Sequence, residues 1–368
     1  RAITDAVRET YDVVNLGRAL QGMPALAPNG GARFHFEAPG SMQGFRVEGD
    51  GGRIQNVERQ GGARNLALRY PGGGPVRALT PTFIPPEAIA MPGYTLLASP
   101  TLYPGQEVQA AVGAAPGNSE PVAARLLLRV YGPNNQLETV EGPSLTLAPG
   151  ELQTLTWIVP GAFGAPIAEV GVEAAPAGNA SGTLYLDFLT WSGTPDVVFT
   201  RQADGGDMWR RAWVDGVDQV DQWPGRWPQP YRIVQNEGTG LISQGTAEWR
   251  DMRASATINV PLANEAGIAV RVGGMRRWYA LFLCHDGIAR LVKARDGRRL
   301  LAEAPLAWNP ERDYDVALEA AGSRLRGWVN DDLLFDVVDE DNPLLAGGIS
   351  LIVSEGRLMA DEVAVRPA

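Results

Sequence analysis

The stretch that decides the fold is WYALFLCHDGIARLVKARDG, residues 278–297. Two strand-like runs, 278–284 and 288–294, are separated by His285-Asp286-Gly287, and Asp296-Gly297 follows the second run. Turns in which glycine follows aspartate are typical of tight connections between neighbouring antiparallel strands. The stretch therefore predicts two consecutive β-hairpins.

Similar runs continue through the C-terminal half, and no helical pattern separates them. They cover residues 253–260, 267–272, 314–320, 324–329, 333–338, 348–354 and 361–365. Asn330-Asp331-Asp332 marks a further hairpin. Short strands joined by such turns predict an antiparallel jelly roll of about a dozen strands over residues 196–368.

A second series of strand-like runs fills residues 31–195. The runs are 34–37, 44–47, 65–70, 125–131, 152–159, 167–173 and 183–191. The 44 glycines and 28 prolines are spread along the chain, as expected for many turns between short strands. The predicted fold class is therefore all-β, with two antiparallel β-sandwich domains of the jelly-roll type.

Residues 2–22 carry the one convincing helical pattern, and a linker follows to residue 30. Ile3, Val7 and Tyr11 recur at helical spacing. An isolated helix of this length is marginal in water. We therefore expect its apolar face to pack on a sandwich or on a further helical domain, with the chain being a piece of a longer protein.

Charge and composition exclude several partners. The net charge of −10 argues against nucleic acid and against an anionic membrane surface. No apolar run is long enough to span a membrane, and the acidic first segment is unlike a signal peptide, which favours a cytoplasmic location. Cys284 is the one cysteine, so it forms no disulfide within the chain and is expected to be a buried, inert thiol.

The residues that usually carry catalysis are scarce. His35 and His285 are the two histidines and fall in different predicted domains, so a histidine-dependent triad is not expected. A glycosidase needs two carboxylates across a cleft. The acidic runs Asp331-Asp332 and Asp339-Glu340-Asp341 lie in predicted turns, where such side chains are usually solvated turn formers. The sequence therefore predicts no catalytic residues.

Two carboxylates in the N-terminal half suggest a metal site. Glu37 lies in the first predicted strand and Asp187 in the last strand of the same domain, and these strands are expected to be neighbours. Calcium binds carboxylate and carbonyl oxygens, so the pair could hold a structural calcium ion. The alternative is that each carboxylate faces solvent or pairs with an arginine.

The tryptophan-rich segment 208–227 has two interpretations. Sugars stack on indole rings, so Trp209, Trp223 and Trp227 with Arg226 could bind a glycan. Alternatively, Trp209 and Trp213, four residues apart, lie on a short helix that joins the domains. We prefer burial near the domain interface for these two, with Trp223 and Trp227 closer to solvent. Trp278-Tyr279 and Trp308 are expected in the core or rim of the jelly roll.

Each half of the chain resembles a known fold. Residues 33–192 are similar to a galactose-binding-like sandwich in the segments Phe34-x-Phe36-Glu37, Gly44-Phe45, 65–68 and 184–187. Residues 205–368 resemble a concanavalin/laminin-G-like jelly roll in the segments 249–251, 266–271, 278–281, 291–293, 347–349 and 361–363.

The whole arrangement resembles the C-terminal region of large bacterial ADP-ribosylglycohydrolase-family proteins. Residues 6–15 are similar to the last helix of the hydrolase domain in that family. The resemblance implies an upstream helical catalytic domain. That family's magnesium-binding acidic clusters have no counterpart in this sequence. The implied function is a non-catalytic accessory region that binds a carbohydrate, or an ADP-ribose-like small molecule. The alternatives are a glycoside hydrolase with carboxylates in the C-terminal jelly roll, and a structural docking or oligomerisation module.

Overall fold

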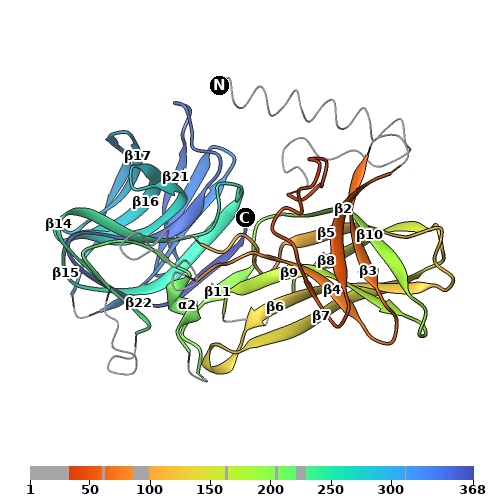
Figure 1. Cartoon of the computed structure of the whole chain (residues 1–368). Coiled ribbons are helices and arrows are strands. Elements are labelled where there is room, and N and C mark those ends of the chain that lie inside the picture. Colours follow the sequence, from red (N-terminus) through yellow and green to blue (C-terminus); the bar gives the residue numbers. More distant parts are fainter. Residues whose placement is uncertain are drawn as a thin grey trace.

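The computed structural model describes residues 33–59, 63–85, 99–161, 165–203, 206–220, 229–310 and 312–368. The predicted helix 2–22, Trp223, Arg226 and Trp227 lie outside these residues. The described chain is built almost entirely from antiparallel strands, and two β-bodies lie side by side (Figure 1). The prediction of an all-β fold is confirmed. No helix among the described residues is long and apolar enough to cross a membrane.

The N-terminal sandwich, residues 33–192, consists of two five-stranded sheets. One sheet has the order β1 (Arg46–Glu48), β4 (Val76–Pro81), β9 (Ile167–Pro176), β6 (Val122–Tyr131) and β7 (Leu137–Leu147). The other has the order β2 (Arg53–Glu58), β3 (Arg64–Tyr70), β10 (Gly182–Ser192), β5 (Glu107–Ala114) and β8 (Leu152–Ile158). A 3-10 turn, Pro133–Asn135, connects β6 and β7. Apolar side chains from both sheets form one shared core.

The first segment of this sandwich pairs with its last strand, as expected. The Phe34 amide donates to the Leu189 carbonyl at 3.1 Å, and the Leu189 amide donates back at 3.0 Å. The predicted strand 34–37 is otherwise wrong, because the pairing stops after one bridge. The backbone turns at Phe36, whose φ of 57° is incompatible with an extended strand.

The C-terminal sandwich, residues 197–368, contains twelve strands connected by hydrogen bonds. They are β11 (Val197–Phe199), β12 (Val214–Gly216), β13 (Gln219–Val220), β14 (Tyr231–Gln244), β15 (Met252–Gly274), β16 (Arg277–Cys284), β17 (Ile288–Arg295), β18 (Arg298–Pro305), β19 (Asp313–Ala321), β20 (Arg324–Val329), β21 (Asp332–Val338) and β22 (Gly348–Pro367). A short helix, α2 (Met208–Arg211), precedes β12.

Three long strands, β14, β15 and β22, run through both layers of this sandwich. Their two halves contribute side chains to the same core, and each strand has a shift of register between the halves. The sequence predicted separate strands at 253–260 and 267–272, but both belong to β15. Likewise 348–354 and 361–365 are parts of β22. A bend does not interrupt the pairing in either strand.

Tight turns set the register of the remaining strands, as predicted. The turn at His285-Asp286-Gly287 joins β16 to β17, and Asp296-Gly297 joins β17 to β18. Asn330 and Asp331 join β20 to β21 with φ angles of 49° and 67°. Two consecutive left-handed residues are the geometry of a type I′ hairpin turn.

Candidate functional site

A polar groove lies on the outer face of the C-terminal sandwich, across β22, β15, β19 and β20. Side chains alternate along β15, so that Ala254 and Ile258 enter the core while Arg253, Ser255 and Thr257 face outwards. The groove has a volume of ≈ 320 Å³. It is large enough for part of an oligosaccharide, and its base is rigid sheet.

The floor of the groove is made by small side chains that the register places in one row. Ser255 on β15 pairs with Ala364 on β22 and with Ala317 on β19, and Ala317 pairs in turn with Trp328 on β20. The three small side chains of Ser255, Ala364 and Ala317 leave a depression beside the indole of Trp328. Trp328 therefore forms a wall of the groove, and its side chain is only partly buried.

One end of the groove is cationic. The Arg253 guanidinium lies 4.2 Å from the centre of the Trp328 ring, and the Arg326 guanidinium lies 5.8 Å from it. Arg326 is neutralised by an ion pair with Glu319. Arg253 has no hydrogen bond or ion pair in the described part of the chain, so its contact with the indole orients the guanidinium while leaving its N–H groups available.

The other end is acidic. Asp315 on β19 accepts a hydrogen bond from the Thr257 hydroxyl at 2.6 Å. Glu362 on β22 and Asp331 in the β20–β21 turn also line the groove. The turn is fixed against β19, because the Asn330 amide donates to the Asp315 carbonyl at 2.8 Å and the Asn330 side chain accepts from the Asp315 amide at 3.1 Å. These bonds place the Asp331 carboxylate at the groove.

The polar side chains of the groove are largely without internal partners. Among the described residues, Arg253, Ser255, Asp331 and Glu362 make no side-chain hydrogen bond or ion pair. Polar groups in a folded protein are usually satisfied by the protein or by water. A groove lined by several unpaired groups of this kind can offer them to a ligand.

The charged outer face of the N-terminal sandwich is different, because its charges satisfy one another. Glu48 accepts hydrogen bonds from Arg129 at 2.6 Å and from Arg77 at 3.1 Å. Arg77 also donates to Glu173 at 2.8 Å. The bond from Arg129 holds the pKa of Glu48 below its usual range, against the opposing effect of burial. This face is an ion-pair network with few groups left for a ligand.

A second hollow, between β17, β18 and the 341–342 loop, is also internally paired. It is lined by Lys293, Arg295, Arg298 and Arg299 and has a volume of ≈ 250 Å³. Each cation has a partner: Asp339, the Asn342 carbonyl, Glu265 and Asp341, respectively. The cationic lining is therefore neutralised within the fold.

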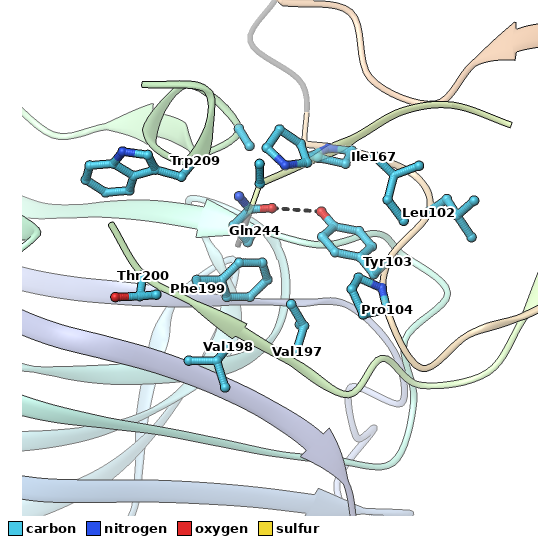
Figure 2. A pocket seen from close by; sticks show the side chains of 14 residues that line it. Leu102, Tyr103, Pro104, Ile167, Val197, Val198, Phe199, Thr200, Trp209 and Gln244 are labelled. Atoms are coloured by element: carbon cyan, nitrogen blue, oxygen red, sulfur yellow. Dashed lines mark hydrogen bonds between the residues drawn. The ribbon is translucent and has the colours of Figure 1, made fainter. Parts of the chain in front are cut away.

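A small, mostly apolar cavity lies between the two sandwiches and is lined by residues of both (Figure 2). Its volume of ≈ 20 Å³ is enough for about one water molecule. Tyr103 of the N-terminal sandwich donates a hydrogen bond to Gln244 of the C-terminal sandwich at 2.8 Å. Asn135 donates to Asp207, the residue before α2, at 2.9 Å. These contacts join the two sandwiches, and the cavity between them is too small for a sugar.

Trp209 lines this cavity, and Trp213 packs on Phe199, which also lines it, so the prediction that both are buried at or near the interface is confirmed. Trp209 is 8% exposed and Trp213 1% exposed. Trp209 lies on α2, and its ring centre is 5.5 Å from that of Tyr231. A ligand-binding role for Trp209 stays a prediction, as do those of Trp223, Trp227 and Arg226, which lie outside the described residues.

Glu37 and Asp187, the predicted calcium ligands, both approach the start of β3. Glu37 accepts a hydrogen bond from the Arg64 amide at 3.3 Å. Asp187 is fully buried at a bulge in β10, 3.3 Å from the Asn65 side-chain amide. Within the described ranges no group of three or more His, Cys, Asp and Glu side chains gathers around a common point. A calcium site would therefore need backbone and amide oxygens as further ligands.

Two sequence predictions about single residues have clear outcomes. Cys284 is 1% exposed, and burial raises the pKa of its thiol to about 11, so it is the inert cysteine that was expected. The expected solvation of Asp339 is wrong. Asp339 is 3% exposed and forms an ion pair at 2.6 Å with Lys293, the one lysine of the sequence.

Trp278 and Tyr279 are buried in the C-terminal sandwich, and Trp308 packs on the rim of its core, as expected. Trp328 is not among the residues that the sequence predicted for a site. A signal was present, because Arg324, Arg326 and Trp328 alternate with Leu325, Gly327 and Val329 and so share the outer face of β20. The groove itself depends on the register of four strands that are distant in sequence.

The structural neighbours of the chain are carbohydrate-binding modules and galectin-like β-sandwiches. The carbohydrate-binding module CBM66 from Bacillus subtilis is 15% identical with a TM-score of 0.36, over 42% of this chain and 94% of that one. The CBM22-1–CBM22-2 tandem domain from Paenibacillus barcinonensis is 10% identical with a TM-score of 0.32, over 91% of this chain and 96% of that one.

A protein of unknown function with a galectin-like fold from Bacillus subtilis is 13% identical with a TM-score of 0.35, over 44% of this chain and 92% of that one. No protein-family model and no curated protein matches the sequence. Similarities at this level leave the function to be inferred from the residues of the groove.

Proposed function

We propose that the C-terminal sandwich is a carbohydrate-binding module whose ligand lies over Ser255 and Ala317, beside Trp328. The observation that carries the proposal is the groove itself, in which a partly exposed indole stands next to polar side chains without internal partners. The apolar C–H face of a sugar packs on an indole, while planar charged side chains bind its hydroxyl groups. The groove supplies both kinds of contact.

Binding explains the groove better than catalysis. Asp315 and Glu362 are two carboxylates in one groove, as a glycosidase would need, but both are exposed on the face of the sheet. The acid of a glycosidase usually has its pKa raised by burial. A purely structural docking module would not need unpaired polar groups in a groove. It would need a continuous apolar surface, whereas the exposed apolar side chains are scattered, for example Leu262 and Leu345.

Replacing Trp328 tests the proposal. A screen of polysaccharides first identifies one that the wild-type protein binds. We expect W328A to weaken binding to that polysaccharide by about thirtyfold, since truncating an aromatic anchor costs about 2 kcal/mol. Isothermal titration with a soluble oligosaccharide of that polymer measures the change. W157A, a partly buried tryptophan of the N-terminal sandwich, is the matched control.

Equal loss of binding in W328A and W157A would overturn the assignment of the groove, as would unchanged binding in W328A. Release of reducing sugar by the wild-type protein would instead indicate the glycoside hydrolase alternative, and E362Q would then be expected to abolish it.

We also propose that the chain is an accessory region of a larger hydrolase of the ADP-ribosylglycohydrolase type. Support comes from the resemblance of residues 6–15 to the last helix of that catalytic domain. The coding sequence upstream of Arg1 tests this proposal. A helical domain with paired acidic motifs is the expected result, and any other catalytic domain would contradict it.

A structural calcium ion at Glu37 and Asp187 remains our proposal for the N-terminal sandwich. Support comes from their convergence on the Arg64-Asn65 segment and from the burial of Asp187. At about a hundredfold excess over Kd, calcium would stabilise the domain by about 2.7 kcal/mol. We expect a chelator to lower its Tm, and D187N to remove the response. Unchanged melting after chelation would contradict the proposal.

A further inference from the structure

The groove is strongly asymmetric in charge. Arg253 is the one cation among its lining residues, and Asp315, Asp331 and Glu362 are three carboxylates at the opposite end. The chain as a whole has a net charge of −10. A uronate or sulfate sugar would be repelled by the acidic end, whereas a positively charged group would be attracted to it.

Asp331 brings its carboxylate to the acidic end of the groove from the β20–β21 turn. Asp331 is the second of two left-handed residues in the β20–β21 turn, with a φ of 67°. Glycine adopts this conformation without strain and is the usual residue at this position of a type I′ turn. Aspartate carries a small conformational cost here, as Asp296 does in the β17–β18 turn, so glycine would keep the backbone of the turn while removing the carboxylate.

We propose that the groove binds a glycan that carries a free amino group, of the glucosamine type, with its ammonium among Asp315, Asp331 and Glu362. This inference rests on the proposed carbohydrate-binding function and adds the class of ligand. An ammonium has three N–H donors, and Asp331 and Glu362 have unoccupied acceptor oxygens. Arg253 and Trp328 then hold the hydroxyl groups and the C–H face of the next sugar. N-acetylation removes the charge that this end of the groove selects.

Titration calorimetry with two tetrasaccharides, fully deacetylated and fully acetylated glucosamine oligomers, tests the inference in mildly acidic buffer. We expect the deacetylated oligomer to bind about tenfold more tightly, since a charge-assisted hydrogen bond contributes that order of selectivity. Added salt should reduce the difference. E362Q and D331G should abolish the difference, because each should lower the affinity for the deacetylated oligomer more than the affinity for the acetylated oligomer.

D296G is the matched control for D331G. Asp296 is also a left-handed aspartate in a hairpin turn, with a φ of 58°, but it lies between β17 and β18, outside the groove. Both variants relieve backbone strain, so the Tm of each should equal or exceed that of the wild-type protein. Only D331G should lose the preference for the deacetylated oligomer.

The possible failures are distinguishable. Equal affinity for the two oligomers, or a preference that D331G and E362Q retain, would overturn the inference and leave the carbohydrate-binding function intact. Trp328-dependent binding of a neutral hexose oligomer, with no binding of the deacetylated oligomer, would also overturn the inference and leave the carbohydrate-binding function intact. If no sugar binds in a manner that depends on Trp328, both proposals fail.

Discussion

W213A is expected to lower the free energy of unfolding of the C-terminal sandwich by about 3 to 5 kcal/mol, the range for large aromatic truncations in cores. Trp213 is among the largest fully buried side chains and is 1% exposed. Its ring centre lies 5.5 Å from that of Phe199 on β11 and 5.1 Å from that of Tyr231 on β14. Its removal would open a cavity between three parts of the fold that a rigid sheet cannot close.

Urea denaturation followed by circular dichroism measures this effect, with W328A as the matched control. Trp328 lies in the same sandwich but on its outer face, so its truncation should cost about 1 kcal/mol or less. W213F should fall between W213A and the wild-type protein, because it keeps an aromatic contact with Phe199 and Tyr231. A loss in W213A no larger than that in W328A would contradict the packing described for the interface.

The same cluster couples the two sandwiches. Tyr103, from the N-terminal sandwich, has its ring centre 4.7 Å from that of Trp249 and 6.1 Å from that of Phe199. The Gly245 amide donates to the Tyr103 hydroxyl at 3.1 Å. Aromatic rings from both domains therefore share one buried cluster, so the domains are held in a fixed relation rather than connected by a free linker.

The sequence was sufficient for the fold class because its signals are local. Alternating residues such as 65–70 and turn residues such as Asp296-Gly297 act within a few positions, and the structure has β3 and a hairpin there. The failures have physical causes. Pro261 and the polar pair Asn264-Glu265 interrupt the alternation in β15, and the chain bends there without ending the strand. No strand was predicted over residues 137–147, which contain Pro143. The structure has β7 there, and it is an edge strand, in which proline is tolerated.

The candidate site could be predicted less well than the fold. The prediction that Trp209 and Trp213 share a short helix is wrong, because α2 ends at Arg211, and Trp213 is buried instead by packing on Phe199 and Tyr231. The groove arises because Ser255, Ala317 and Trp328 occupy one row across three strands. A shift of one residue in any pairing would send one of these side chains to the opposite face. Register between distant strands is not readable from one sequence, so the tryptophan on the outer face could not be distinguished from those in the core.

The buried pair of Lys293 and Asp339 gives a second large expected effect. The Lys293 ammonium donates to Asp339 at 2.6 Å and to the Asn342 carbonyl at 3.0 Å. The Tyr279 hydroxyl also donates to Asp339 and accepts from the Leu344 amide at 2.8 Å. These bonds attach the 339–344 segment to the sheet. We expect D339A to cost about 3 to 5 kcal/mol, because it leaves a buried ammonium without a counter-charge.

A compensating variant separates the charge effect from loss of packing. K293M/D339N removes both charges and keeps an acceptor for Tyr279, so it should recover most of the stability that D339A loses. Lys293 is the one lysine, and its side chain is 5% exposed. Labelling of lysine by an amine reagent should therefore be slow in the wild-type protein and fast in D339A. Equal labelling rates would show that the pair does not hold this segment closed.

The same pair predicts how stability depends on pH. Burial alone would raise the pKa of Asp339, but the hydrogen bonds from Lys293 and Tyr279 outweigh it and hold the pKa below its ordinary value of about 3.9. Because the folded-state pKa is lowered, the contribution of this carboxylate is fully present above the ordinary value and is lost as the pH falls through the folded value. Acid should thus destabilise the wild-type protein more than K293M/D339N. Parallel acid-unfolding curves for the two proteins would contradict this role for Asp339.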